Sequence, residues 1–306
     1  TKNVHSVLDY SVEGKEVENQ FDFAMEKILH ILKFVKEKDA IPFAVFKPTG
    51  FGRFKIYQKI TENKSLTEEE KLEWERVRQR YEKVAKLAFD YDVPLLIDAE
   101  ESWMQDAVDD LTEELMMKYN KEKAIVFSTL QLYRWDRMEY LKGLNERAKK
   151  HNFKIGMKLV RGAYMEKERE RAEEKGYTNP ICKDKAATDK NFDDVLKFMF
   201  ENIDKMAIFC GTHNEESSYL FMDLINKSGL EKNDQRLWFG QLYGMSDHIS
   251  YNLAQEGYNV AKYLPFGPVK DVMPYLIRRA EENTSVSGQT SRELDLISRE
   301  KKRRKL

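Results

Sequence analysis

The chain lacks the features that mark secreted, membrane-spanning and nucleic-acid-binding proteins. Its 306 residues include two cysteines, too few for a disulfide framework or a cysteine-based zinc site. No apolar run approaches the roughly 18 residues that a helix needs to cross a bilayer. The net charge of −1 shows no bulk basic excess, so we expect no nucleic-acid partner. A reducing compartment is therefore the expected environment.

Several catalytic signatures are also missing. The sequence contains no G-x-G-x-x-G, no Walker P-loop and no G-x-S-x-G elbow. His213, Asp98 and Glu100 could imitate part of a metal site, but no second histidine cluster supports them, and we predict no metal. Cys210 lies inside an apolar run, which is typical of a core residue rather than a nucleophile.

What the chain does have is a regular alternation of short apolar runs and longer amphipathic, charged stretches. The apolar runs are Val4–Tyr10, Ile41–Phe46, Val93–Ile97, Ala124–Leu132, Ile155–Val160, Met206–Cys210, Leu237–Leu242 and Val260–Leu264. Helices are predicted at Glu69–Tyr91, Trp103–Lys118, Asp136–Lys150, Asp189–Asn202, Glu215–Lys227, Ile249–Glu256 and Val272–Glu282. Strands that each precede a helix indicate a parallel sheet, and this number of units favours a closed barrel.

The predicted fold is therefore an α/β, distorted (β/α)8 TIM-type barrel that fills a single catalytic domain over residues 1–306. We expect it to be imperfect because the helices Lys27–Lys38 and Glu69–Tyr91 look extra or over-long. The charged stretch Leu66–Arg80 is predicted to be an exposed helix face. The ends, residues 1–3 and 300–306, are expected to be flexible.

Polar side chains lie at the ends of most of the apolar runs or directly after them, where barrels of this type carry their chemistry. They include Lys47, Asp98, Glu100, Gln131, Lys158, Arg161, Thr212, His213 and Tyr263. Singly, each could be a snorkelling lysine, a helix cap or a core hydrogen-bonding group. Together they favour a polar ligand at the barrel mouth, because buried polar groups need partners.

A tyrosine and two adjacent arginines lie near the C-terminal end of the chain. Tyr275 precedes Arg278 and Arg279 by one helical turn. Guanidinium groups bind a carboxylate with two parallel hydrogen bonds, so this spacing suggests a pocket for a small carboxylic acid. Solvation of a helix end by the two arginines remains the alternative on these residues alone.

The sequence resembles the flavin-dependent proline dehydrogenases over nearly its whole length. The shared motifs are Asp98-Ala-Glu-Glu, Lys158-Leu-Val-Arg-Gly-Ala-Tyr164, Thr212-His-Asn214, Gly244-Met245 and Tyr275-x-x-Arg-Arg279, in the family's order. The resemblance implies a distorted (β/α)8 barrel with non-covalent FAD at its C-terminal mouth. Position 158 departs from many bacterial members, which have Arg there; Lys keeps the charge but loses the planar fork.

The resemblance also implies roles for individual residues. The expected FAD-binding positions are Ala99, Gln131, Lys158, Val160, Arg161, Gly162, Ala163, Thr188, Thr212 and His213. The expected substrate pocket comprises Lys47, Tyr164, Leu242, Tyr263, Tyr275, Arg278 and Arg279. Asp98 and Lys158 are the expected catalytic residues, and Glu13 is expected to form a gating ion pair with Arg278. Whether Asp98 acts as a base or only as an ion-pair partner stays open.

The implied reaction is oxidation of L-proline to Δ1-pyrroline-5-carboxylate by hydride transfer to FAD N5. Electrons would pass to a quinone, which implies peripheral membrane contact. The expected location is the cytoplasmic face of a bacterial inner membrane. It is the mitochondrion if the chain is eukaryotic, with a targeting segment removed before Thr1.

Three other functions remain open at this point. Hydroxyproline oxidation is the nearest, but Tyr263 stands where that sister group typically has a small residue, which favours plain proline. A non-catalytic barrel that binds a carboxylate metabolite is the second. A metal-dependent barrel hydrolase around His213 and Asp98 is the third.

Overall fold

The structure is a computed structural model that describes residues 3–270, 272–273, 275–277 and 289–304, with the side chains of 289–296 left aside. Its contacts group into two compact units, Thr1–Pro265 and Phe266–Leu306, which we describe separately. The predicted single domain over residues 1–306 stays a prediction.

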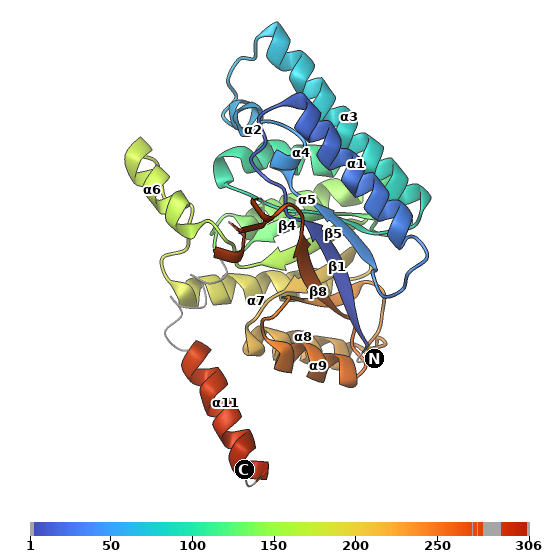
Figure 1. The fold of residues 1–306 in the computed structure, drawn as a ribbon, viewed down its shortest axis with the longest axis vertical. Coiled ribbons are helices and arrows are strands. Elements are labelled where there is room, and N and C mark those ends of the chain that lie inside the picture. Colours follow the sequence, from blue (N-terminus) through green and yellow to red (C-terminus); the bar gives the residue numbers. More distant parts are fainter. Residues whose placement is uncertain (1–2, 271, 274, 278–288, 305–306) are drawn as a thin grey trace. The chain divides into compact units, whose positions relative to one another are not determined.

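The first unit is built around a closed barrel of eight parallel strands, paired in sequence order (Figure 1). The strands are β1 (Val4–Tyr10), β2 (Phe43–Phe46), β3 (Leu95–Ile97), β4 (Val126–Gln131), β5 (Ile155–Val160), β6 (Met206–Gly211), β7 (Leu237–Leu242) and β8 (Val260–Phe266). This confirms the predicted (β/α)8 fold class. The bounds of β1, β5 and β7 are those predicted, because an apolar run buried on both faces marks a barrel strand clearly.

Alternate residues of the strands fill the barrel interior with a cluster of large rings. Phe43 contacts Phe127, Phe209 and Trp238 edge-to-face, with ring centroids 5.8, 5.2 and 5.1 Å away. We call these four residues the aromatic plug. All four are buried, and edge-to-face pairs add to the stability that burial provides.

Two strand glycines leave space for the rings of the plug. A Cβ built on Gly240 would lie 2.1 Å from a ring carbon of Phe209, well inside van der Waals contact. Gly156 faces Phe127 in the same way, at 2.7 Å. The interior therefore pairs large residues with glycines, as a packed barrel core requires.

Helices surround the barrel, and their apolar stripes pack on the outward faces of the strands. They are α1 (Glu18–Val35), α3 (Glu68–Asp90), α4 (Ser102–Tyr119), α5 (Arg137–His151), α7 (Lys185–Glu201), α8 (Glu215–Ser228) and α9 (Asp247–Gln255). The predicted irregularity lies after β2, where the short helices η1 (Pro48–Gly50) and α2 (Phe54–Thr61) precede α3. α3 begins at a capping box between Thr67 and Glu70, which satisfies two backbone N–H groups.

Several helix predictions need correction. α1 begins at Glu18 rather than Lys27, since Phe21 and Ala24 continue its buried stripe toward the N-terminus. Helix α6 (Met165–Lys175) was not predicted, because it buries only Glu168 and Ala172 and so shows no apolar stripe.

The charged stretch at the start of α3 is not simply an exposed face. Arg80 is 4% exposed and donates its Nε to Asp22, 2.8 Å away, in α1. Glu73 is 5% exposed and accepts from Arg53 Nε at 2.8 Å. The prediction of an exposed face is therefore wrong for these two residues: a charged side chain can be buried where it is paired.

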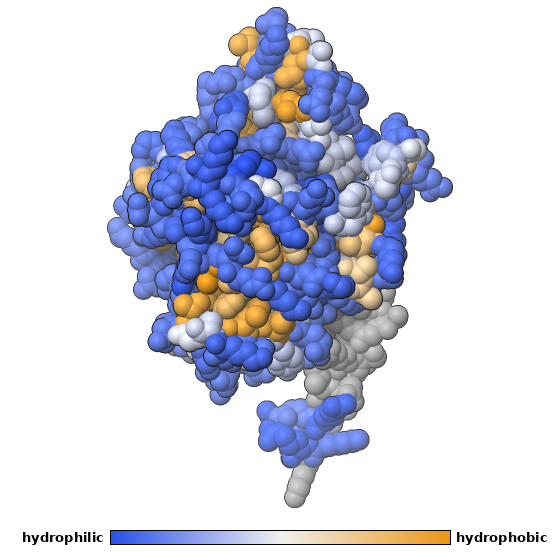
Figure 2. Space-filling model, turned by 180° about the vertical axis from the view of Figure 1, so that it is seen from behind, coloured by the Kyte–Doolittle hydropathy of each residue, from blue (hydrophilic) through white to orange (hydrophobic). Residues whose placement is uncertain are grey.

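The second unit contains helix α11 (Gln289–Arg304), which was not predicted. Most of the predicted helix Val272–Glu282 lies outside the described residues, although 272–273 and 275–277 are helical. Across the part of the chain that is described, no helix is both long and apolar enough to cross a membrane. The face shown in Figure 2 is largely hydrophilic, with smaller apolar patches.

Candidate functional site

The alternation that builds the apolar interior also carries charged residues into it at the C-terminal ends of the strands. Lys47 follows the inward-facing Val45 by two residues, and Asp98 follows Leu96 in the same way. Side chains two apart in a strand share a face. The barrel interior thus changes from apolar to ionic over one step along these strands.

Asp98 lies between two lysines. Its Oδ2 accepts a hydrogen bond from Lys47 Nζ at 2.7 Å, and its Oδ1 accepts one from Lys158 Nζ. Lys158 also donates to the hydroxyl of Tyr263 at 3.1 Å, and its Nζ lies 4.9 Å from the centre of that ring. All four residues are buried. The structure therefore brings together four of the predicted site residues.

Asp9 completes this group, and the sequence analysis did not single it out. Its Oδ2 lies 3.9 Å from Lys47 Nζ and accepts from Ser11 Oγ at 3.0 Å. Its Oδ1 is buried and has no hydrogen-bond partner among the described residues. The sequence did carry a signal for Asp9: it is an acidic residue inside the apolar run Val4–Tyr10, on the same strand face as Val7. We call Asp9, Lys47, Asp98 and Lys158 the ionic cluster.

Burial and mutual attraction act in opposite directions on the charges of the ionic cluster. Burial alone would raise the pKa of Asp98, but the charges of Lys158 and Lys47 lower it to about 2. Burial raises the pKa of Asp9, although Lys47 opposes the change. Burial lowers the pKa of Lys158 despite the attraction of Asp98. Two carboxylates facing two ammonium groups give a formally neutral cluster whose Asp98 stays ionised at neutral pH.

A further buried carboxyl group, that of Glu100, lies on the loop between β3 and α4. Glu100 accepts hydrogen bonds from Thr49, from the backbone N–H at 3.1 Å and from the hydroxyl at 2.7 Å. Its own carbonyl oxygen accepts from Gln131 Nε2 at 2.5 Å. Burial, with the nearby charges of Glu101 and Glu13, raises the pKa of Glu100 to about 8. Asp98 does not cap α4, whose N-cap is Glu101.

Arg161 follows β5 and is held by three hydrogen bonds. Its guanidinium donates to Asp189 Oδ1 at 2.7 Å, to Thr212 Oγ1 at 2.7 Å and to Ser217 Oγ at 3.1 Å. It also lies over the Phe192 ring, 4.6 Å from its centre. This guanidinium is thus fixed in place beside a stretch of accessible backbone.

That backbone stretch begins at Gly162, whose φ is +132°. A Cβ there would lie 2.5 Å from the ring of Tyr133, so only glycine fits. Gly162 and the following Ala163 are exposed. A ligand could therefore approach the main chain closely at this point.

His213 links two loops of the barrel mouth. Its Nδ1 lies 2.9 Å from Ser246 Oγ, and the backbone N–H of Leu242 donates to its Nε2 at 3.5 Å. In this arrangement Nδ1 carries the proton and His213 holds the end of β7. The predicted ligand positions Ala99 and Val160 are half-buried, Thr188 is buried in the first turn of α7, and Tyr164 is buried before α6.

The remaining predicted residues lie outside the described part of the first unit. Tyr275 belongs to the second unit. Arg278 and Arg279 lie outside the described residues, and so does the proposed Glu13–Arg278 pair. Within the described ranges, no group of three or more His, Cys, Asp or Glu side chains could hold a metal ion.

Comparison with known sequences identifies the protein family to which the chain is similar. The sequence model of the family described as proline dehydrogenase matches residues 1–292. The chain belongs to the proline dehydrogenase family. This confirms the resemblance drawn from the motifs and makes the chain a member of an oxidoreductase family.

Two relatives show how widely the similarity to this family extends. Human mitochondrial proline dehydrogenase 1 is 41% identical over 235 residues, which cover 76% of this chain and 39% of that protein. The carbapenem antibiotics biosynthesis protein CarD of Pectobacterium carotovorum subsp. carotovorum is 38% identical over 300 residues, 97% of this chain and 77% of CarD. The chain therefore spans well under half of the human protein.

Solved structures agree on the fold. The crystal structure of proline utilization A (PutA) from Bdellovibrio bacteriovorus, inactivated by N-propargylglycine, matches with a TM-score of 0.80. The match covers 95% of this chain and 31% of that one at 24% identity. At this identity the likeness bears on the barrel fold alone.

The donor set fits a flavin dinucleotide. A diphosphate needs cationic or N–H donors, which the fixed Arg161 and the accessible backbone at Gly162 offer. A flavin ring needs polar donors at the strand ends, and Lys158 and Gln131 reach that end of the barrel. The residues present are therefore compatible with FAD at the mouth.

Proposed function

We propose that the chain oxidises L-proline to Δ1-pyrroline-5-carboxylate with non-covalently bound FAD. The observation that carries the proposal is the buried Lys47–Asp98–Lys158 arrangement against Tyr263, at the strand ends of a family barrel. When bound, the flavin would supply the hydride acceptor for the oxidation. Arg161, Gly162 and Gln131 would hold it, together with the other positions named from the resemblance.

The ionic cluster acts by positioning. Asp98 fixes both lysine ammonium groups, and Lys158 in turn fixes the Tyr263 hydroxyl that faces the substrate. A carboxylate with a pKa of about 2 binds protons weakly at neutral pH. We therefore assign Asp98 the role of ion-pair partner rather than that of the base that deprotonates the proline amine.

The substrate is held at two ends. Arg278 and Arg279 bind the carboxylate of proline, with Tyr275 and Tyr164 beside it, and Glu13 pairs with Arg278 when the pocket is closed. Leu242 covers the apolar ring, and His213 keeps Leu242 in place through the backbone N–H. Orientation by such contacts lowers the barrier because the reacting carbon is already placed.

Anaerobic reduction is the direct test of this reaction. Purified protein reconstituted with FAD is expected to be yellow, and this visible absorption is expected to bleach when proline is added without oxygen. A folded protein that binds no flavin, or a bound flavin that proline does not bleach, would contradict the proposal.

The carboxylate assignment has its own test. Arg278→Met is expected to raise KM for proline by roughly a hundredfold while FAD stays bound, since a charge-assisted bidentate contact contributes about 3 kcal/mol. The control is Arg303→Met, whose side chain is 70% exposed and pairs with Glu300. Unchanged proline kinetics in Arg278→Met would overturn the assignment.

Substrate and acceptor are tested together. Proline and hydroxyproline are compared as substrates, and the bulk of Tyr263 favours proline. A soluble quinone is offered as acceptor, since we propose that electrons pass to a membrane quinone. Faster turnover of hydroxyproline would contradict proline as the substrate. Failure of the quinone to reoxidise the protein would contradict the quinone as electron acceptor. The proposed location is the cytoplasmic face of a bacterial inner membrane or the mitochondrion.

A further inference from the structure

Helix α6 is fastened to the barrel by polar contacts rather than by an apolar stripe. Only Glu168 and Ala172 of its residues are buried. Figure 1 shows α6 standing away from the strands, joined to them by the loop that follows β5. Something other than hydrophobic burial must set its position.

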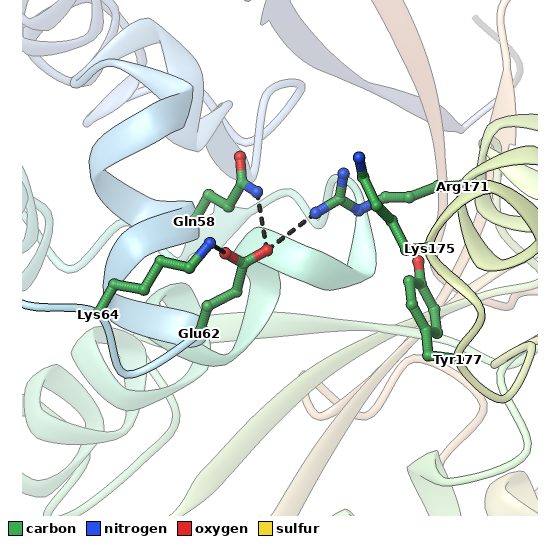
Figure 3. A pocket seen from close by; sticks show the side chains of 6 residues that line it. All are labelled: Gln58, Glu62, Lys64, Arg171, Lys175 and Tyr177. Carbon is green, nitrogen blue, oxygen red and sulfur yellow. Dashed lines mark hydrogen bonds and ion pairs between the residues drawn. The ribbon is translucent and has the colours of Figure 1, made fainter.

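A hollow lies beside α6, on the side of the helix that carries Arg171 and Lys175. The hollow measures about 660 Å³ and lies between α6 and the end of α2, lined by Gln58, Glu62, Lys64, Arg171, Lys175 and Tyr177. Arg171 reaches across it to Glu62, with Nη2 and Oε1 2.8 Å apart (Figure 3). On this side, a partly exposed ion pair ties α6 to the end of α2, and the same guanidinium lies 4.6 Å from the centre of the Trp103 ring in α4.

Glu168 makes the firmest contact of the helix. Its Oε1 accepts from the backbone N–H of Ser102 at 2.6 Å, and its Oε2 accepts from Ser102 Oγ at 2.6 Å. Glu168 is 0% exposed, so its carboxylate depends on these bonds in place of water. Burial raises its pKa, which Ser102 partly offsets.

Ser102 is the first residue of α4, and its N–H is one of the donors that a helix leaves unsatisfied at its start. The N-cap of α4, Glu101, makes no side-chain capping bond. Glu168 therefore caps α4 from a distant part of the chain, where a negative charge also suits the helix dipole.

The two loops that this contact joins both lead to the candidate site. The loop before α4 carries Asp98 and Glu100, and the loop before α6 carries Arg161 and Tyr164. We propose that Glu168 is a positioning residue that, through Ser102, fastens the β3–α4 loop to the β5–α6 loop at the barrel mouth. The effect on proline oxidation rests on the proposed function; the effect on the two loops does not.

The test measures both effects. Glu168→Ala removes both bonds, and amide hydrogen exchange in the flavin-free protein is expected to become at least tenfold faster over residues 99–103, on the other side of the contact. KM for proline is expected to rise about tenfold in the flavin-loaded protein. Glu168→Gln keeps an acceptor for the Ser102 N–H. This variant is therefore expected to have an exchange rate over residues 99–103 and a KM for proline close to those of the parent.

The matched control is the neighbouring residue of the same helix. Lys167 pairs with Glu101 at 3.0 Å, but its side chain is 62% exposed, and such pairs contribute little. Lys167→Met is therefore expected to match the parent within twofold in exchange and in KM.

Each outcome decides one part of the inference. Parent-like exchange over residues 99–103 in Glu168→Ala overturns the fastening. Faster exchange with unchanged KM overturns the positioning role. If Glu168→Ala does not fold, Ser102→Ala, which removes the hydroxyl bond alone, is judged by the same two measurements. A parent that never oxidises proline refutes the proposed function, while the exchange result still decides the fastening.

Discussion

Replacing Asp98 by Asn tests the ionic cluster most directly. The change keeps the size of the side chain and removes the charge that Lys47 and Lys158 share. Asp98 is 8% exposed, so water cannot replace the lost interaction. Among the described ion pairs, the carboxylate that then remains beside the two buried ammonium groups is Asp9, whose Oδ2 is 3.9 Å from Lys47 Nζ.

The expected size follows from two considerations. A pKa lowered from 3.8 to about 2 corresponds to about 2.5 kcal/mol of stabilisation. Removing one partner of a buried ion pair typically costs about 3–5 kcal/mol. We expect Asp98→Asn to lower the free energy of unfolding at pH 7 by about 3 kcal/mol. For a chain of 306 residues this is a fall in Tm of roughly 5 °C.

The assay is urea unfolding of the flavin-free protein, followed by circular dichroism and tryptophan fluorescence. Coincident transitions establish that a single free energy applies. A double-mutant cycle with Lys158→Met separates the pair from its surroundings: the double variant should be less destabilised than the sum of the two, by about 2 kcal/mol.

Asp223→Asn is the control, because the Lys227–Asp223 pair is exposed, at 74% and 51% of the two side chains. It is expected to change stability by less than about 0.5 kcal/mol. Additive effects of Asp98→Asn and Lys158→Met would refute the reasoning, since they would show that the two charges do not interact.

Three further predictions concern single residues. Gly162→Ala places a Cβ against the Tyr133 ring at a strained φ and should destabilise by about 1–3 kcal/mol and weaken flavin binding, as urea unfolding and flavin titration measure. Glu100 has a pKa of about 8, above its usual 4.5, so its ionisation opposes folding and stability should fall as pH rises from about 4.5 to about 8. Glu100→Gln should remove that fall, and an unchanged slope would contradict this. Asp9→Asn should destabilise by less than half as much as Asp98→Asn in urea, because burial already raises the pKa of Asp9; an equal loss would contradict it.

The barrel and much of the ionic cluster were predictable because they depend on local patterns. Buried strands appear in the sequence as apolar runs. Lys47 and Asp98 directly follow two of these runs and Lys158 lies within a third, and Asp98 and Lys158 each begin one of the family motifs. Asp9 was overlooked because it lies inside a run that was read only as a strand. Its pairing with Lys47 involves two strands and cannot be read from either alone.

Helix α6 was missed for a different physical reason. Periodicity detects a helix through the apolar face that it buries, and α6 is positioned by a buried carboxylate instead. The pairing of Glu168 with Ser102 joins residues 66 positions apart. Arg80 and Glu73 likewise look like surface charges in the sequence, and only the packing of α3 on its neighbours shows that they are buried.

The aromatic plug has a kinetic consequence. Phe43 and its three ring neighbours fill the barrel axis, and Phe209 contacts the ring of Tyr263, 5.8 Å between centroids, so the plug directly underlies the ionic cluster. A molecule that reaches the cluster must enter from the carboxyl ends of the strands. Under the proposed reaction, proline and the electron acceptor would share that one entrance and would have to use it in turn. Steady-state rates should then show parallel lines in double-reciprocal plots, as in a ping-pong sequence.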